Sequence, residues 1–218
     1  MSVSSVRLPS DVAISKLTFV NPRSMSSSGA KSVSILYEGK PLVIQVSNLL
    51  APYGMNEMTA DNGDIKYSLN LSLPDNKEDD LYKLLEGIDR KATQEFFVNC
   101  QKWCNRTVKS FEAVELLYTP VVKQSKDEKY PPTFKIQVPS KDQCINVDVF
   151  DASRQRVDDP SKLGWKRAKV SAILQCGGMW ITGNRFGITF KAVQFKVVPW
   201  VDNRIVGYAF KEDVDADE

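Results

Sequence analysis

The chain has 218 residues, with 29 Lys and Arg, 27 Asp and Glu and no histidine, so its formal net charge is only +2. The absence of histidine excludes Ser-His and Cys-His nucleophile pairs, His-ligated zinc and the commonest general base. A hydrophobic content of 42% is enough for a core, and the length suits one domain or one domain with an elaboration. An enzyme of this composition would depend on carboxylates, Lys, Tyr or Cys.

The small net charge conceals two segments of opposite sign. Residues 211–218 contain five acids and one Lys, whereas residues 1–210 contain 28 basic and 22 acidic residues. Residues 160–200 contain seven basic residues and no acid, where about five acids would be expected at the average of the chain. A basic body with an acidic C-terminal tail is the first indication of function.

The sequence has no feature of a membrane or secreted protein. No apolar run approaches the ~18 residues that a membrane span needs, and the Ser-rich N-terminus lacks the hydrophobic core of a secretory signal. Four cysteines are too few for a disulfide scaffold. We expect inert thiols rather than zinc ligands at Cys100, Cys104, Cys144 and Cys176, an intracellular location, no membrane contact and no cofactor.

The first part of the chain predicts strands joined by short turns. Residues 33–36 and 42–46 flank a Glu-Gly-Lys turn at 38–40, which indicates a β-hairpin. In residues 65–73 the odd-numbered positions are apolar and the even-numbered ones polar. That alternation predicts a strand with one buried face, and Pro74 ends it.

One long helix is expected over about residues 76–104. Asp75 or Asn76 can cap it, and the acids of its first turn suit the helix dipole. Apolar residues recur at helical spacing at Leu81, Leu84, Leu85, Ile88, Ala92, Phe96, Cys100 and Trp103. Residues 110–117 form either a short second helix or an extended segment.

The second part of the chain predicts a series of strands, over residues 133–138, 143–151, 166–175 and 187–198, with a glycine-rich hairpin at 176–186. A parallel sheet would need helices between successive strands, and only one helix is convincing. The expected fold is therefore mainly β, a small closed barrel of the OB type with an inserted long α-helix.

This fold divides the chain into three parts. Residues 1–63 form an N-terminal β-rich extension that packs on the barrel or belongs to it. Residues 64–208 form the OB-fold domain that binds nucleic acid. Residues 209–218 form the acidic tail.

The acid-free segment has the residue types that bind single-stranded nucleic acid. Cations neutralise phosphates and release counterions, and aromatic faces stack unpaired bases at ~1–3 kcal/mol each. The candidate contacts are Trp165, Lys166, Arg167, Lys169, Trp180, Arg185 and Phe186. The alternative is that Trp165 and Phe186 belong to the core and that the lysines form an ordinary solvated face.

The acidic tail suits a basic groove or a basic partner protein. It can occupy the groove as an intramolecular competitor for nucleic acid, or it can bind a partner, unless it is only a solubilising segment. The residues of this segment are Phe210, Glu212, Asp213, Asp215, Asp217 and Glu218.

Candidate enzyme sites are weaker. Asp148, Asp151, Asp158 and Asp159 lie near one another in the sequence but lack the spacing of a metal-binding loop. The glycines at 177, 178 and 183 are not followed by the Gly-Lys-Ser/Thr of a phosphate loop. We expect no catalytic and no metal site, although a carboxylate nuclease centred on Asp148 and Asp151 is one alternative.

Several segments of the chain resemble a known family. They are YPPTFKIQV at 130–138, INVDVFD at 145–151, GWKRAKVSAILQC at 164–176, MW at 179–180 and GITFKAVQF at 187–195. Together they resemble the single-stranded DNA-binding proteins of podoviruses (the T7 type), and more closely their relatives in nucleocytoplasmic large DNA viruses. The resemblance covers roughly residues 64–218. The phage tails end in an aromatic residue, whereas here Phe210 precedes the acids.

The resemblance implies an OB fold and sequence-tolerant binding and protection of single-stranded DNA in viral DNA replication, recombination and repair. It implies that Trp180 stacks bases, that the strand with Lys166, Arg167 and Lys169 binds phosphates, and that the tail contacts replication proteins such as DNA polymerase or helicase-primase. The location would be viral replication sites in the host cytoplasm or nucleus, and homodimerisation is left open. The alternative of another class is a structural or virion β-barrel protein that makes protein contacts.

Overall fold

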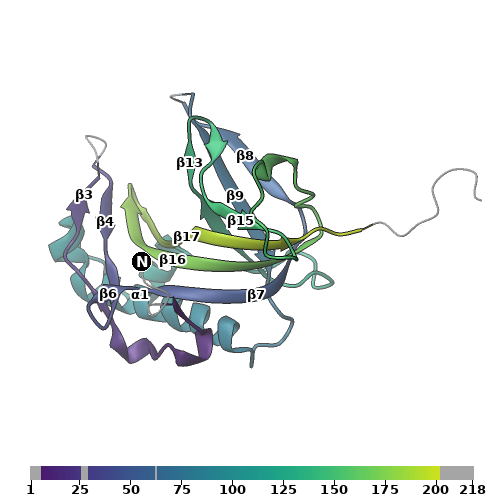
Figure 1. Ribbon diagram of the computed structural model, residues 1–218. Helices are drawn as coiled ribbons and strands as arrows, with labels where there is room; N and C mark the ends of the chain where they lie inside the picture. Colours follow the sequence, from purple (N-terminus) through teal and green to yellow (C-terminus); the bar gives the residue numbers. More distant parts are fainter. Residues whose placement is uncertain (1–5, 26–28, 62, 202–218) are drawn as a thin grey trace, which may run out of the picture.

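A computed structural model describes residues 6–25, 29–61 and 63–201, and it consists mainly of β-strands with two α-helices (Figure 1). The mainly β architecture with an inserted long helix agrees with the prediction from the sequence. No helix in the described ranges is both long enough and apolar enough to span a membrane.

Five strands form the centre of the largest sheet: β7 (Val43–Ala51), β9 (Ile65–Ser72), β12 (Thr133–Val138), β16 (Ala168–Thr182) and β17 (Arg185–Val198). β16 pairs with β17 and with β7, β17 pairs in parallel with β12, and β12 pairs with β9. β7 also pairs with β9, but only through Leu50 and Ser72. The ring of pairings is therefore joined by one residue pair, and a cleanly closed OB barrel is not confirmed.

Shorter strands complete three sheets. They are β1 (Val6–Arg7), β2 (Leu17–Phe19), β3 (Arg23–Ser24), β4 (Lys31–Val33), β5 (Ile35–Tyr37), β6 (Lys40–Pro41), β8 (Met55–Thr59), β10 (Tyr118–Thr119), β11 (Val122–Lys123), β13 (Ser140–Lys141), β14 (Cys144–Ile145) and β15 (Asp148–Phe150). Three 3-10 turns lie at Pro9–Asp11, Ile14–Lys16 and Pro160–Lys162. In Figure 1, β3 and β4 rise at one side of the long β16–β17 hairpin, and β8, β9 and β13 rise at the other.

The long helix α1 (Asp80–Cys104) begins four residues later than the sequence predicts. Its N-cap is Asp79, whose carboxylate accepts hydrogen bonds from the amides of Leu81 and Tyr82 at 2.9 and 3.2 Å. The expected cap at Asp75 or Asn76 was wrong because Asp79 satisfies the free amides of the first turn. The open alternative at 110–117 is settled as a helix, α2 (Phe111–Leu117), with Ser110 as its cap.

The core lies between α1 and the sheet. Phe96 of α1 stacks on Phe186 of β17 with ring centroids 3.9 Å apart, and Trp103 packs edge-on against Phe96. Inside the ring of strands, Phe134 and Phe190 meet edge to face. The apolar stripe of α1 thus covers one side of the β16–β17 hairpin and leaves the other side uncovered.

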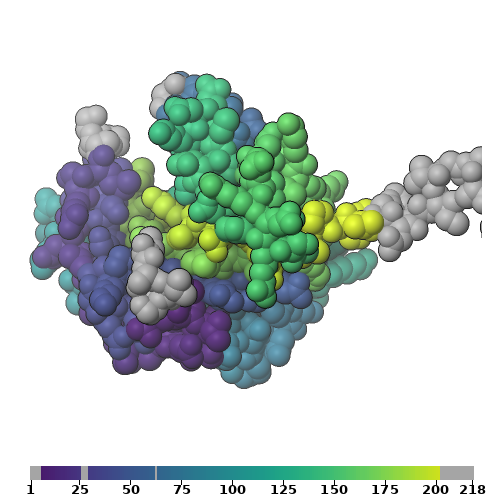
Figure 2. Space-filling model, viewed as in Figure 1, coloured from purple at the N-terminus to yellow at the C-terminus, as the bar shows by residue number. Residues whose placement is uncertain are grey.

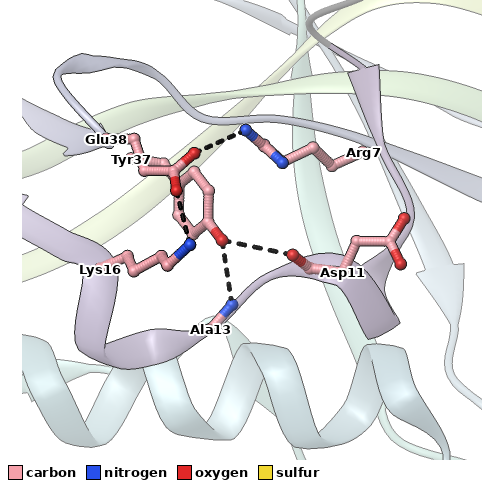
Figure 3. Close-up of polar contacts among 6 residues, drawn as sticks. All are labelled: Arg7, Asp11, Ala13, Lys16, Tyr37 and Glu38. Carbon is pink, nitrogen blue, oxygen red and sulfur yellow. Dashed lines mark hydrogen bonds and ion pairs between the residues drawn. The ribbon is translucent and has the colours of Figure 1, made fainter.

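An ionic and aromatic network attaches the N-terminal segment to the β5–β6 hairpin (Figure 3). Glu38 in the hairpin turn pairs with Arg7 at 2.8 Å and with Lys16 at 2.6 Å. The buried Tyr37 lies under Arg7, whose guanidinium is 4.5 Å from the ring centroid, and its hydroxyl donates to the carbonyl of Asp11 at 3.3 Å. These contacts hold residues 6–16 against the sheet, on the side of α1.

The predicted glycine-rich loop is instead part of two long strands. β16 continues through residues 176–182, and only Gly183 and Asn184 form the turn before β17. The register of β16 against β17 shifts between Cys176 and Gly178, so that Gly177 forms a β-bulge. Gly178 has φ +92°, and a Cβ there would lie 2.5 Å from the carbonyl oxygen of Val33. Glycine is required at this close approach to β4.

A buried carboxylate connects α1 to the segment after α2. Asp89 accepts hydrogen bonds from the Tyr118 hydroxyl and from the amide of Val121 at 3.1 Å. Burial is the largest influence on this carboxyl and raises its pKa to about 6, although the hydrogen bonds oppose the shift.

This raised pKa predicts a pH-dependent stability. Because the native state holds the proton more tightly than the unfolded state does, the contribution of Asp89 is complete below pH 3.8 and is lost as the pH rises through about 6. Asp89→Asn has no such loss. The free energy of unfolding of the variant should therefore rise relative to wild type by up to ~3 kcal/mol between pH 4 and 7.

Urea unfolding at four pH values measures this difference, with the exposed Glu128→Gln as the control for loss of a surface charge. A constant difference between Asp89→Asn and wild type from pH 4 to 7 would contradict the assignment.

Candidate nucleic-acid interface

The side of the β16–β17 hairpin that faces away from α1 carries a row of polar and basic side chains. Along β17, Phe186, Ile188 and Phe190 are buried, whereas Thr189 is half-buried and Lys191 is exposed. Since side chains of a strand alternate between its two faces, Thr189 and Lys191 lie opposite the core. We call this side the open face, and its residues on the two strands include Lys169, Ser171, Gln175, Trp180, Thr189, Lys191 and Lys196.

The open face lies at the bottom of a hollow. Figure 2 shows the molecule hollowed between the wall that contains β3 and β4 and the wall that contains β8, β9 and β13. Strand pairing connects both walls to the hairpin, because β4 pairs with β16 and β12 connects β17 to β9. Side chains from strands that are far apart in the sequence therefore share one concave surface.

Trp180 lies at one end of this surface. It pairs with Gly187 on one side and with Ser32 on the other, and Ser32 pairs in turn with Arg23. A Cβ at Gly187 would lie 2.9 Å from Cζ2 of Trp180, so the indole ring covers this glycine. The ring is half-buried, with one side seated on the sheet, and Arg23 lies two strands away on the same face.

Three lysines converge at the other wall. Lys191 pairs with Gln137 of β12, and a groove of about 490 Å³ contains Lys66, Lys135 and Lys191 together with the exposed Met58. Within the described residues none of these lysines forms an ion pair, because the five observed pairs involve other residues. Three like charges without a counter-charge favour a polyanionic ligand.

A second groove of about 410 Å³ crosses the far half of the open face. Lys169 and Lys196 lie in it, beside the polar side chains of Gln45 and Ser171. Ser171 accepts a hydrogen bond from the amide of Asn48 at 3.0 Å, which fixes the edge of β7 against β16. The basic surface thus continues along the whole length of the hairpin.

The structure corrects two of the predicted base-stacking residues. Trp165 is 4% exposed, packs against Phe195 and donates its indole N–H to the carbonyl of Pro160 at 2.7 Å. Phe186 is 1% exposed and is stacked on Phe96. Both rings complete the core, so the prediction that they stack bases was wrong for this conformation.

The predicted cations are all exposed, but they do not share one strand. Lys166 and Arg167 precede β16 rather than forming its first residues, and Arg167 has φ +63°. Lys169 lies on the open face, and Arg185 lies at the tip of the hairpin. Beside this tip Arg106 donates hydrogen bonds to the carbonyl of Gly183 and to Asn184, at 2.8 and 2.9 Å.

The sequence-based prediction missed the cations of the neighbouring strands. Lys66 and Lys135 each occupy the polar side of an alternating strand, and this pattern was the available signal. Arg23 had none, because its proximity to Trp180 depends on the pairing of β3, β4 and β16.

The tail residues Phe210, Glu212, Asp213, Asp215, Asp217 and Glu218 lie outside the described residues. Within the described ranges no group of three or more Cys, Asp or Glu side chains is placed to hold a metal ion. Burial raises the pKa of the Cys176 thiol to about 11, which disfavours the reactive thiolate. Asp148 pairs with Arg156 at 2.8 Å.

Comparison with known proteins gives remote matches only. No family model and no curated protein matches the chain. The single-stranded DNA-binding protein gp2.5 of bacteriophage T7 is 16% identical, with a TM-score of 0.47, over 82% of this chain and 96% of that one. The single-stranded DNA-binding protein of bacteriophage Enc34, in complex with single-stranded DNA, is 14% identical, with a TM-score of 0.43, over 86% of this chain and 98% of that one. These values are too low to place the chain in a family.

Proposed function

We propose that this protein binds single-stranded DNA along the open face, with little dependence on base sequence, and that it has no enzymatic activity. The observation that carries the proposal is the cluster of Lys66, Lys135 and Lys191 without ion pairs, in the same hollow as Trp180. Lysines that track a backbone, together with an aromatic ring that stacks bases, are the combination that binds unpaired strands of any sequence.

The arrangement of strands supports an OB barrel as the framework. The central strands follow the ring β7–β9–β12–β17–β16–β7, with β12 and β17 parallel and the other pairs antiparallel. An OB fold is a five-stranded, partly open barrel that presents one face of its strands to nucleic acid. The single pair between Leu50 and Ser72 is the opening in this barrel.

Trp180 has the geometry of a stacking platform rather than of a core residue. Its seat on Gly187 fixes the plane of the ring, and a fixed ring loses little conformational entropy when a base stacks on it. Arg23 and Arg185 at the same end of the open face supply cations for the flanking phosphates.

Titration of labelled oligonucleotides tests the proposal. Wild type should bind single strands more tightly than duplexes and should lose affinity steeply as salt rises. Trp180→Ala should weaken binding by ~1–3 kcal/mol if the ring stacks one base. Fluorescence anisotropy of the oligonucleotide is the readout, so the loss of a tryptophan does not alter the signal.

Leu116→Ala is a matched control, because Leu116 is 81% exposed on α2. If wild type does not bind single strands at low salt, the proposed function is rejected and the alternative of a structural β-barrel protein is favoured. If Trp180→Ala binds as wild type does, Trp180 is not part of the interface.

We further propose a viral role for the protein in DNA replication, recombination and repair, and an inhibitory role for the acidic tail. The net charge of −4 in residues 211–218 complements the basic open face, and Phe210 precedes it. The tail would compete with DNA for the groove and would contact replication proteins such as DNA polymerase or helicase-primase when DNA displaces it.

Deletion of residues 211–218 should therefore tighten the binding of single-stranded DNA, most strongly at low salt, because an anionic competitor is removed. Anisotropy titrations of full-length and truncated protein at two salt concentrations measure the change. Weaker binding after the deletion would contradict competition by the tail.

A further inference from the structure

A second aromatic surface lies at the opposite end of β16 from Trp180. Trp200, directly after β17, is 48% exposed, and the guanidinium of Arg167 lies 5.2 Å from the centroid of its ring. The exposed Tyr53 belongs to a turn that contacts the same segment, because Arg167 donates its amide to the carbonyl of Ala51 at 2.8 Å. This end of the sheet therefore presents a Trp, a Tyr and a cation together.

The cation–π contact organises this surface. Arg167 precedes the first residue of β16 with φ +63°, and the guanidinium covers one face of the Trp200 ring. An arginine over an indole is a favourable pair that also leaves guanidinium N–H groups for a phosphate. A half-exposed ring with one face covered in this way has its open area available to a base.

A continuous basic track connects the two aromatic ends. Lys169 and Lys196 lie in the groove next to Trp200, and Lys191 follows toward Trp180. The twelve residues between Ala168 and Trp180 correspond to roughly 40 Å along β16. At ~3.4 Å per nucleotide of a B-form strand this distance needs about twelve nucleotides, and fewer in a stretched strand.

We infer that Trp200, held by Arg167, is a second base-stacking platform, and that one DNA strand occupies both Trp180 and Trp200 only when it is long enough to span β16. This inference rests on the proposed function and assigns the far end of the same interface. A short oligonucleotide binds at one platform, whereas a long one binds at both, and affinity therefore increases sharply with length.

Oligothymidylates of 4 and 16 nucleotides, measured by anisotropy against the full chain, test the inference. Trp200→Ala should weaken binding of the 16-mer by about 5–100-fold, the effect of one lost stacking contact, and binding of the 4-mer by no more than about twofold. Trp200→Phe should restore most of the affinity for the 16-mer, since Phe retains a stacking face.

Tyr130→Ala is the control, because Tyr130 is also exposed (62%) but lines neither basic groove. Equal binding of the 16-mer by Trp200→Ala and wild type overturns the second platform and leaves the proposed function intact. Equal loss for both lengths also overturns it, because the effect is then not one of span. Failure of wild type to bind either oligonucleotide rejects the proposed function itself.

Discussion

The β-bulge at Gly177 determines which side chains of β16 face the ligand. Before the bulge, the exposed positions of the strand are odd-numbered, as at Lys169 and Ser171, and after it Trp180 is even-numbered. A one-residue shift moves every following side chain to the other face of a sheet. Without the bulge Trp180 would point toward α1, whereas with it Met179 enters the core and Trp180 joins the lysines. The close approach of Gly178 to Val33 is the cost of this register, and it fixes β4 beside the tryptophan.

The charge of the chain has meaning only by region. A net charge of +2 is the difference between a basic body and the acidic residues 211–218. Inside the body the ion pairs lie mainly at the N-terminal network and on the loops, for example Glu38 with Arg7. The lysines of the open face remain without partners among the described residues. Uncompensated charge in a concave surface costs little in water but attracts a polyanion strongly at low salt.

The sequence predicted the mainly β fold, the long helix and the strand at 133–138, because alternation and helical spacing are local properties. It also predicted the importance of the acid-free segment. It failed for Trp165 and Phe186, since a composition of cations and aromatics does not tell which rings complete the core. The position of Arg23 beside Trp180 depends on strand pairing between distant segments, which no local pattern reveals. Trp200 was missed because its partner, Arg167, lies 33 positions earlier.

The central claim is that the lysines of the open face bind DNA phosphates. The most direct test is the slope of log Kobs against log salt concentration for a 16-nucleotide single strand, in wild type and in a variant with Lys66→Gln, Lys135→Gln and Lys191→Gln. Each lost phosphate contact on a single strand lowers the slope by about 0.7, so the triple variant should lose about 2. A control variant replaces Lys77, Lys102 and Lys126, which are exposed outside this face, and should keep the slope of wild type. Equal slopes for the open-face variant and wild type would contradict the account.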